Sequence, residues 1–449
     1  MHMNTKLTRR SFLTKTTTTI ATLSVVRSSV LGLRGAESPN NKLNIAAIGL
    51  CNQGGGDLQG MTSENIVALC DVDTRYSAKH AGKFPAAKQY QDFRRMFDEM
   101  GKQIDAVLIA TPDHWHAALA LQAMKLGKHV YCEKPLAHSI YEVRELMKTV
   151  RETKVTTQLG NQGHSFDSIR VFREWIEDGA VGTVREVHAM CRSVYSRVDI
   201  LDEVRRGQPV PETLNWDLWV GPAPFRPYHS TYHPGRWRSW TNFGTGVIGD
   251  WTCHVVDPVF WTLDLGAPAT IEAVDTSNWD PKTQGETFPA GNIIRYEFPA
   301  KGNRAAVRLT WYDGPKKPAR PAELEPDEKL PDIGAVVVGD KAKILYGSHG
   351  ATAPRIIPDA GTDKFSRRPQ RYPRSPGHQK EWIEACKARK SAGSDFSYGG
   401  PLTEVALLGV IAMRFKGQKL AWDSAAMRFT NCAEANSYLK PTFRPGWGL

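Results

Sequence analysis

The chain has 449 residues and a formal net charge of +11, with 41% hydrophobic and 23% charged residues. This length exceeds one ordinary domain, so we expect two or three domains with ample cores. Residues 1–36 hold six basic residues and no acidic one, so the remainder carries only +5. No basic helix or aromatic–basic interleaving of the nucleic-acid-binding kind occurs, and we expect a globular protein that binds no nucleic acid.

The first segment, residues 1–36, predicts export. Arg9 and Arg10 are followed by Phe12, Leu13 and a weakly apolar, Thr-rich run. This pattern is similar to a twin-arginine export signal, and it is too short and too poorly apolar for a membrane span. No other stretch reaches spanning length, so we expect a periplasmic protein without a membrane span. A disordered basic terminus is the alternative.

From residue 43 to about residue 157, predicted strands and helices alternate, which indicates a parallel sheet. The following part predicts successive strands with few helices, so we expect a second, α+β domain with an open, largely antiparallel or mixed sheet. The domains predicted are a signal (1–36), a nucleotide-binding domain (42–158) and a substrate and oligomerisation domain (159–449). The first set of elements comprises strands 43–49, 65–71, 105–111 and 129–133 and helices 115–126 and 140–153. The second comprises strands 184–192, 270–276, 292–298, 305–311 and 334–346, long loops 193–243 and 348–377, and helices 378–389 and 402–415.

Residues 49–54 follow the first predicted strand and open a helix, as a dinucleotide-binding turn must. Gly49 would form the tight turn, and Gly54 would allow close packing of helix on strand. The backbone N–H groups of Cys51, Asn52 and Gln53 would then face the pyrophosphate. Cys51 departs from the usual glycine where the backbone comes closest to the phosphates.

Asp71 ends the second predicted strand. A carboxylate there accepts hydrogen bonds from the adenosine ribose and repels a 2′-phosphate. The sequence therefore predicts NAD rather than NADP as the cofactor. Asp73 is a second candidate for this role, and a simple turn residue is the alternative for either.

Lys134 closes the last predicted strand of this domain, at the sheet edge where open α/β sheets bind their ligands. An ammonium there would stabilise negative charge on a substrate oxygen as a hydride departs. A surface lysine at a strand end is the alternative.

Asp250 and His254 lie four residues apart, on one face if the segment is helical. A histidine near its ordinary pKa, oriented by a neighbouring carboxylate, is the usual general base for alcohol oxidation. We expect His254 to accept the hydroxyl proton while Lys134 stabilises the oxygen. A surface helix pair, or a histidine satisfied in the core, is the alternative.

The seven cysteines are scattered through mostly apolar runs without C-x-x-C spacing, so neither zinc nor a disulfide framework is expected. His114 and His116 have the spacing of a metal pair but lack a third ligand nearby. A strand-to-helix turn packed near the cofactor is the better interpretation, and we expect no metal. The cysteines are Cys51, Cys70, Cys132, Cys191, Cys253, Cys386 and Cys432.

Taken in order, these motifs resemble the Gfo/Idh/MocA family (glucose–fructose oxidoreductase, inositol dehydrogenase and rhizopine-catabolism proteins). The resemblance covers nearly the whole chain after residue 36. Its most specific parts are Glu133-Lys134-Pro135 and the Asp250–His254 pair. Residues 160–164, 237–240 and 444–447 resemble the exported, twin-arginine branch.

The resemblance implies a Rossmann domain followed by an α/β domain whose open sheet makes contacts in a homo-oligomer of two or four chains. It implies that Lys134 and His254 are catalytic, that Asp250 contacts substrate or cofactor, and that Pro135 follows a cis peptide. The cofactor contacts that it implies come from Thr111, Pro112, His116 and Glu133.

Further candidates follow strand ends or lie in the long loop 193–243. Asn161 is predicted beside the cofactor, and Gln162 and His164 beside substrate hydroxyls, with helix capping as the alternative. Trp237 and Arg238 would form a sugar platform or a subunit contact, and Arg192, with Tyr195, would face the pocket.

The sequence thus predicts a periplasmic NAD-dependent oxidoreductase of a sugar, glycoside or cyclic polyol, with tightly bound cofactor. The alternative is an NAD-dependent glycoside hydrolase that works by transient oxidation, elimination, hydration and reduction. A catalytically silent sugar- or NAD-binding protein is a third possibility, which the presence of both Lys134 and His254 disfavours.

Overall fold

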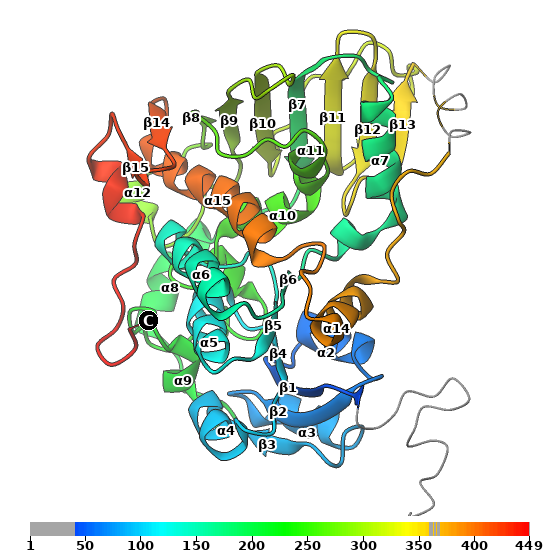
Figure 1. Ribbon diagram of the computed structural model, residues 1–449. Coiled ribbons are helices and arrows are strands. Elements are labelled where there is room, and N and C mark those ends of the chain that lie inside the picture. The colour runs from blue at the N-terminus through cyan, green and yellow to red at the C-terminus, as the bar shows by residue number, and fades with distance from the viewer. Residues whose placement is uncertain (1–40, 359–361, 363–364, 366–368, 449) are drawn as a thin grey trace, which may run out of the picture. The chain divides into compact units, whose positions relative to one another are not determined.

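The computed structural model describes residues 41–358, 362, 365 and 369–448, so the predicted signal lies outside the described residues. Within them, a first sheet has the order β3-β2-β1-β4-β5-β6, and every neighbouring pair is parallel (Figure 1). This confirms the parallel sheet expected from the alternation of strands and helices. Its strands are β1 (Asn44–Ile48), β2 (Asn65–Cys70), β3 (Lys88–Tyr90), β4 (Ala106–Ile109), β5 (His129–Cys132) and β6 (Thr157–Leu159).

Both faces of this sheet are covered by helices. Side chains of β1 alternate between two cores, as the two-residue period of a strand requires: Ala46 and Ile48 belong to one core, Ile45 and Ala47 to the other. Burial on both faces explains why these strands are apolar throughout. The first core includes residues of α4 (Phe93–Met100), α5 (Asp113–Lys125) and α6 (Ile140–Thr153), and the second those of α2 (Gln53–Gly60), α3 (Thr74–Ala81) and α14 (His378–Ala388).

The second sheet has the order β13-β12-β11-β7-β10-β9-β8-β14-β15 within the described residues. Its pair β7–β10 is parallel and its other neighbours are antiparallel, which confirms the expected open, largely antiparallel sheet and the α/β class. Its strands are β7 (Val184–Cys191), β8 (Thr270–Asp275), β9 (Ile293–Phe298), β10 (Val307–Asp313), β11 (Ile333–Gly339), β12 (Lys343–Gly347), β13 (Thr352–Ile357), β14 (Lys419–Asp423) and β15 (Arg428–Phe429).

Helices pack against one face of the second sheet (Figure 1). They are α7 (Asp167–Glu177), α10 (Gly246–Val255), α11 (Asp257–Thr262) and α15 (Phe396–Ala412). Together with its following turn, α15 forms the described helix Phe396–Phe415, which is long and apolar enough to cross a membrane. However, 78% of its apolar 18-residue stretch is buried inside the protein. A helix that is apolar all round is typical of a protein core. The expectation that no stretch beyond the signal reaches spanning length was therefore wrong.

Several predicted boundaries were also wrong. The strand predicted at 334–346 is a hairpin of β11 and β12, closed where Gly339 N–H donates to the carbonyl of Ala342 (3.0 Å). The helix predicted from residue 402 begins at Phe396, because the Asp395 side chain accepts hydrogen bonds from two backbone N–H groups of its first turn. The predicted loop 193–243 contains α8 (Leu201–Arg206) and α9 (Trp216–Val220).

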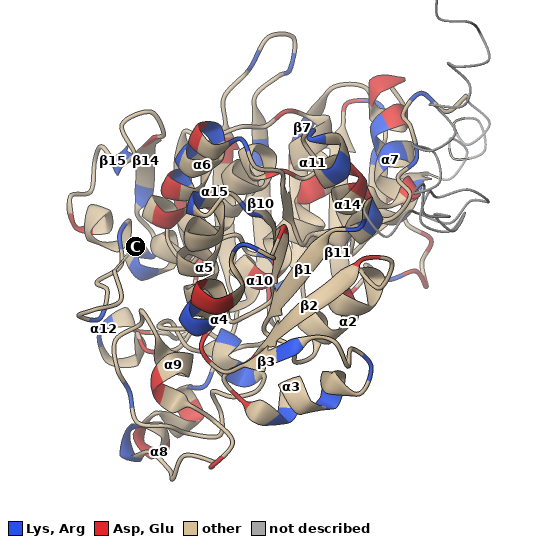
Figure 2. Cartoon of the chain, turned by 60° about the horizontal axis from the view of Figure 1, so that its bottom comes forward, with Lys and Arg blue, Asp and Glu red and all other residues tan. Residues whose placement is uncertain are grey.

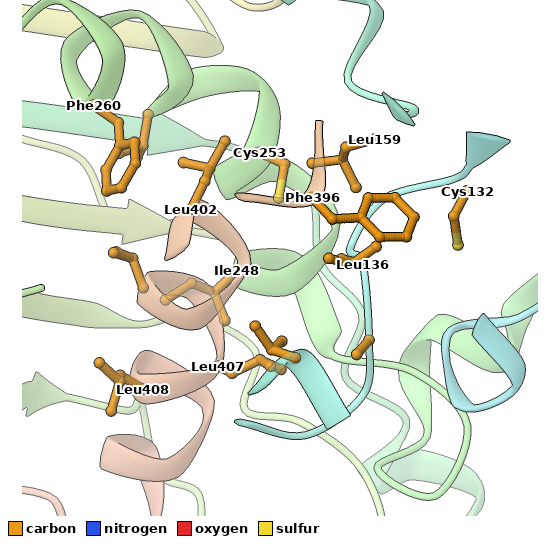
Figure 3. Close-up of a cluster of buried hydrophobic side chains, with 14 of the residues drawn as sticks. Cys132, Leu136, Leu159, Ile248, Cys253, Phe260, Phe396, Leu402, Leu407 and Leu408 are labelled. Carbon is orange, nitrogen blue, oxygen red and sulfur yellow. The ribbon is translucent and has the colours of Figure 1, made fainter. Parts of the chain in front are cut away.

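An apolar junction holds α10 and α15 against the end of the first sheet (Figure 3). Cys132 at the end of β5 and Leu159 of β6 share this core with Cys253 of α10 and Leu402 of α15. Packed cores resist small displacements. The junction therefore fixes the residues just after Cys132 relative to those beside Cys253.

Charged residues of both signs are interspersed over the surface helices α4, α6 and α8 (Figure 2). Several form ion pairs, such as Arg94 with Asp92 (2.6 Å) and Arg173 with Glu177 (2.8 Å). Exposed pairs of this kind contribute little to stability individually. The formal excess of basic residues is thus spread over the described surface rather than gathered on one of these helices.

Candidate active site

A cleft lies at the carboxyl ends of the strands of the first sheet, where open α/β sheets bind ligands. Its open volume, mouth included, is about 990 Å³, at the upper end of the size of ligand pockets. Most of the cofactor residues expected from the sequence line it, together with the predicted catalytic Lys134: Gly49, Cys51, Asn52, Gln53, Asp71, Thr111, Pro112 and Glu133.

The glycine turn after β1 leaves no room for side chains at its two predicted glycines. Gly49 has a φ of +84°, and a Cβ there would lie 2.6 Å from the carbonyl oxygen of Ala110. A Cβ on Gly54 would lie 2.1 Å from the oxygen of Gly49. Both glycines are therefore required for the close packing of α2 on β1 and β4. Cys51 is half-buried and lines the cleft between them.

Asp71 follows β2 and lines the cleft, whereas Asp73 does not. The carboxylate of Asp71 accepts hydrogen bonds from Leu50 N–H (2.8 Å) and Asp73 N–H (2.9 Å). Burial raises the pKa of Asp71 to about 6. Asp73 binds Arg75 (2.6 Å) and His233 (3.0 Å). Of the two candidates for the ribose contact, the structure places Asp71 at the cleft.

Residues 193–243 close one side of the cleft. Asn215 N–H donates to the carbonyl of Val72 (2.9 Å), and Nε2 of His233 donates to Oδ2 of Asp73 (3.0 Å). The length and composition of this loop were the signal for a functional role, but they did not identify which residues reach the cofactor cleft. The residues of this segment that line the cleft are Leu218, Trp219, His233, Pro234 and the predicted Trp237 and Arg238.

Lys134 lies at the end of this cleft, just after β5, and the Lys134–Pro135 peptide is cis, as the resemblance implies. Its Nζ donates to Oδ1 of Asp250 on α10 (2.6 Å). Nε of Arg238 donates to the same oxygen (3.1 Å), and the hydroxyl of Tyr195 donates to Oδ2 (2.7 Å). The structure thus brings together residues from four distant segments around one carboxylate.

This carboxylate is ionised and Lys134 is protonated. Burial alone would raise the pKa of Asp250, but the charges of Lys134 and Arg238 lower it well below its usual range. Burial alone would lower the pKa of Lys134, but Asp250 raises it above its ordinary value. Two cations against one anion leave a net positive charge, which suits stabilisation of a developing alkoxide.

His254 follows Asp250 by one helical turn of α10 and is 4% exposed. Asp250 does not orient it as expected, because the two cations and Tyr195 occupy the carboxylate, and Nδ1 of His254 has no hydrogen-bond partner among the described residues. Burial, then the charges of Lys134 and His349, lower the pKa of His254 well below its usual range, so the expected ordinary pKa was also wrong. A neutral imidazole is nevertheless the form that accepts a proton.

His114 and His116 are structural supports rather than cleft residues. Nδ1 and Nε2 of His116 lie 2.7 Å and 2.8 Å from the carbonyl oxygens of Pro135 and Thr111. Burial lowers the pKa of His114 to about 3 and that of His116 to about 4. The structure therefore does not bring His116 to the cofactor cleft. The His116 ring instead links the Lys134–Pro135 turn to Thr111, which follows β4.

The remaining candidates lie away from the cleft-lining surface. Asn161 is fully buried and accepts a hydrogen bond from Ser394 (2.7 Å), while Gln162 is half-buried. His164 is 2% exposed, with Nδ1 3.0 Å from Asp257. Arg192 forms an exposed ion pair with Asp332 (2.8 Å), so its predicted position in the pocket was wrong.

Comparison with known proteins finds two family models in this chain. One is described as an oxidoreductase family, NAD-binding Rossmann fold, and matches residues 43–161; the other, its C-terminal alpha/beta domain, matches residues 200–287. Both models are those of the Gfo/Idh/MocA family, and the chain is similar to that family over these residues. Its first domain is accordingly an NAD-binding Rossmann domain, as the sequence predicts.

Curated relatives within the Gfo/Idh/MocA family match part of the chain. The levoglucosan dehydrogenase of Pseudarthrobacter phenanthrenivorans is 28% identical over 48% of this chain and 46% of its own length. A glycosyl hydrolase family 109 protein of Saccharopolyspora erythraea is 28% identical over 53% of this chain and 47% of its own. The matched segment thus spans about half the length of these relatives.

Solved structures resemble the whole fold. A levoglucosan dehydrogenase in complex with NADH aligns with a TM-score of 0.56 at 16% identity, over 85% of this chain and 99% of the other. At that identity the likeness concerns the fold alone.

Features of the cleft itself, apart from the comparisons, fit NAD. The glycines leave the backbone of the turn open to close approach, and Asp71 supplies a carboxylate at the end of β2. Thr111 Oγ1 is a buried atom of a cleft-lining residue without a hydrogen-bond partner among the described residues. Buried polar atoms of this kind normally have partners, which a bound ligand would supply.

Proposed function

We propose that this protein is an NAD-dependent oxidoreductase that acts on a hydroxyl group of a sugar, glycoside or cyclic polyol. The observation that carries the proposal is the buried Lys134–Asp250 pair at the end of the NAD cleft, one helical turn from neutral His254. A protonated lysine and a neutral histidine are the two groups that alcohol oxidation requires.

Each residue has a defined task in this chemistry. Bound NAD would supply the hydride acceptor, and cleft-lining residues such as Gly49, Asp71 and Thr111 would hold it. Lys134 stabilises the negative charge on the substrate oxygen, and His254 takes the hydroxyl proton. Asp250 holds Lys134 and Arg238 in place and keeps Lys134 protonated. The segment 193–243 shields the cleft from water on one side.

The proposal includes export and a retained cofactor. The pattern around Arg9 and Arg10 supports transport by the twin-arginine route, which carries folded proteins into the periplasm. Free nicotinamide cofactor should be scarce there, so NAD would be bound before export and regenerated in place by paired oxidation and reduction. The contacts of residues 193–243 with Val72 and Asp73 support slow release of NAD. A homo-oligomer assembled through the open second sheet belongs to the same proposal.

A direct experiment is to purify the full chain and measure bound NAD(H), then add levoglucosan or myo-inositol. Stoichiometric NAD(H) that is reduced by one of these substrates would support the proposal. Protein that lacks bound cofactor and turns over with added NAD would contradict the closed cycle but not the oxidation.

A second candidate function is glycoside cleavage by transient oxidation. The match to a protein named as a glycosyl hydrolase favours it, since oxidation beside a glycosidic bond acidifies the neighbouring C–H and allows elimination. An aryl glycoside separates the two functions. Release of the aglycone without net NADH would indicate hydrolysis, and accumulation of a ketosugar would indicate oxidation.

A further inference from the structure

His349, which the sequence analysis did not single out, lies directly against His254. The centroids of the two rings are 4.1 Å apart, with an angle of 46° between their planes. Trp251 contacts both rings edge-on, at 5.8 Å from His254 and 5.6 Å from His349. His349 is half-buried, whereas His254 is 4% exposed. The second histidine is thus the more accessible ring of the pair.

The position of His349 is fixed by close backbone packing. Gly350 has a φ of +57°, and a Cβ there would lie 2.0 Å from the carbonyl oxygen of Gly163. The hydroxyl of Ser168 donates to the carbonyl of Gly350 (2.7 Å). Any larger residue at position 350 would force the two segments apart. The loop after β12 is therefore held against residues 163–168, and His349 is held against α10.

The two histidines share the same charged surroundings. Lys134 lowers the pKa of both, and Asp250 acts in the opposite direction on both. Nδ1 of His349 lies 2.9 Å from Oγ of Ser348, and no described residue forms a hydrogen bond with its Nε2. Nδ1 of His254 is buried and without a partner among the described residues. At least one nitrogen of each ring therefore has no hydrogen-bond partner among the described residues.

We propose that His349 is the positioning residue of His254: it holds the ring of the base and carries the proton from His254 to solvent. This inference rests on the proposed oxidation. His349 does not touch the substrate in this scheme and acts through His254. It takes the place of the orienting carboxylate, which is absent because Asp250 is bound to Lys134, Arg238 and Tyr195.

The proton movement is balanced without any redox change. A substrate hydroxyl can reach His254 only at Nε2, because Nδ1 is buried. When Nε2 takes the hydroxyl proton, the Nδ1–H bond of His254 breaks, and its proton passes to Nε2 of His349, directly after a small ring rotation or through one water. The imidazolium of His349 then releases a proton from its ring to solvent. Both histidines end neutral.

Two variants separate proton transfer from packing. His349→Phe keeps an aromatic ring against His254 but has no exchangeable proton, and His349→Ala removes the ring and leaves space for a small buffer molecule. His188→Phe is a matched control, because His188 is another half-buried histidine of the second sheet that contacts Tyr312.

The first measurement needs no substrate. In full-length, histidine-labelled protein with NAD added, NMR would report exchange of the His254 ring N–H with solvent, assigned by its loss in His254→Ala. We expect both His349 variants to slow this exchange by roughly 10²-fold, the lower end of the range of general acid–base effects. Added imidazole should restore the rate in His349→Ala, and His188→Phe should match the parent. Parental exchange in both His349 variants would overturn the proposal.

The second measurement is the rate of NADH formation with levoglucosan or myo-inositol at constant pH and rising imidazole concentration. We expect a loss of roughly 10²-fold in both His349 variants, with imidazole rescue in His349→Ala. A different outcome is that His349→Phe reacts at the parental rate while His349→Ala is slow and is not rescued by imidazole. That outcome would show that His349 acts only by packing and would overturn the proposed proton transfer. If the parent oxidises neither substrate, the oxidation proposal is contradicted for those substrates, while the exchange measurement still decides the role of His349.

Discussion

At the scale of single residues, Lys134 has the central role in the proposed chemistry. Lys134→Met keeps the aliphatic stem and removes the charge at the end of the cleft. We expect the single-turnover rate of sugar oxidation to fall by roughly 10²–10³-fold, because stabilisation of the substrate oxygen is lost. Bound NAD should stay near the parental amount, since the turn at Gly49 and the carboxylate of Asp71 are unchanged.

Cofactor absorbance and rapid-mixing kinetics on the same samples would test this expectation. Lys125→Met is the matched control, because Lys125 is exposed in the last turn of α5. A Lys134→Met protein that oxidises sugar at the parental rate would remove this lysine from the mechanism.

Asp113 gives a prediction about pH and stability. Its carboxylate accepts a hydrogen bond from Thr245 (2.7 Å), and burial raises its pKa to about 6. Because the folded-state pKa lies above that of the unfolded chain, the stabilising contribution of this group is present at low pH and is lost as pH rises through about 6. At about 1.4 kcal/mol per pKa unit, the loss amounts to at most about 3 kcal/mol.

Asp113→Asn cannot ionise, so the difference between its free energy of unfolding and that of the parent isolates this one carboxyl. Relative to the variant, the parent should become less stable from about pH 4 to about pH 7. Urea unfolding at several pH values measures the difference. A difference that does not change with pH would show that Asp113 does not titrate in this range.

At the scale of elements, the segment 193–243 should control the release of NAD. His233→Ala removes the hydrogen bond to Asp73, and the loss of about 1–1.5 kcal/mol corresponds to roughly 10-fold faster release. Dissociation of NADH followed by fluorescence would measure this rate. Gln208→Ala, an exposed position of the same segment, should release NADH at the parental rate. Equal rates in all three proteins would contradict a closing role for this segment.

At the scale of the whole molecule, the proposed export depends on the paired arginines. Replacement of Arg9 and Arg10 by lysine keeps the charge but removes the feature that resembles a twin-arginine signal. We expect this protein to accumulate in the cytoplasm, folded and with NAD bound, whereas Arg27→Lys should be exported. Cell fractionation with NAD(H) analysis of each pool tests this. Export of the double variant at the parental level would refute the signal.

The sequence by itself determined the strand–helix alternation of the first domain and the type of each sheet. Apolar strands that alternate with helices predict a parallel sheet, because a covered sheet buries both faces of every strand. The glycine turn at Gly49, Asp71 and Lys134 were predictable for a related reason, since they follow strand ends and the carboxyl ends of parallel strands meet at one edge.

The tertiary structure alone decided which contacts the residues of the site make with one another. Periodicity carries no information about a contact between Lys134 and Asp250, or between His254 and His349, because these pairs are separated by many residues and meet through packing of separate elements. Competition for the Asp250 carboxylate likewise depends on where Arg238 and Tyr195 are placed. The neutral state of His254 follows from burial and a nearby ammonium, and both arise only when the chain folds.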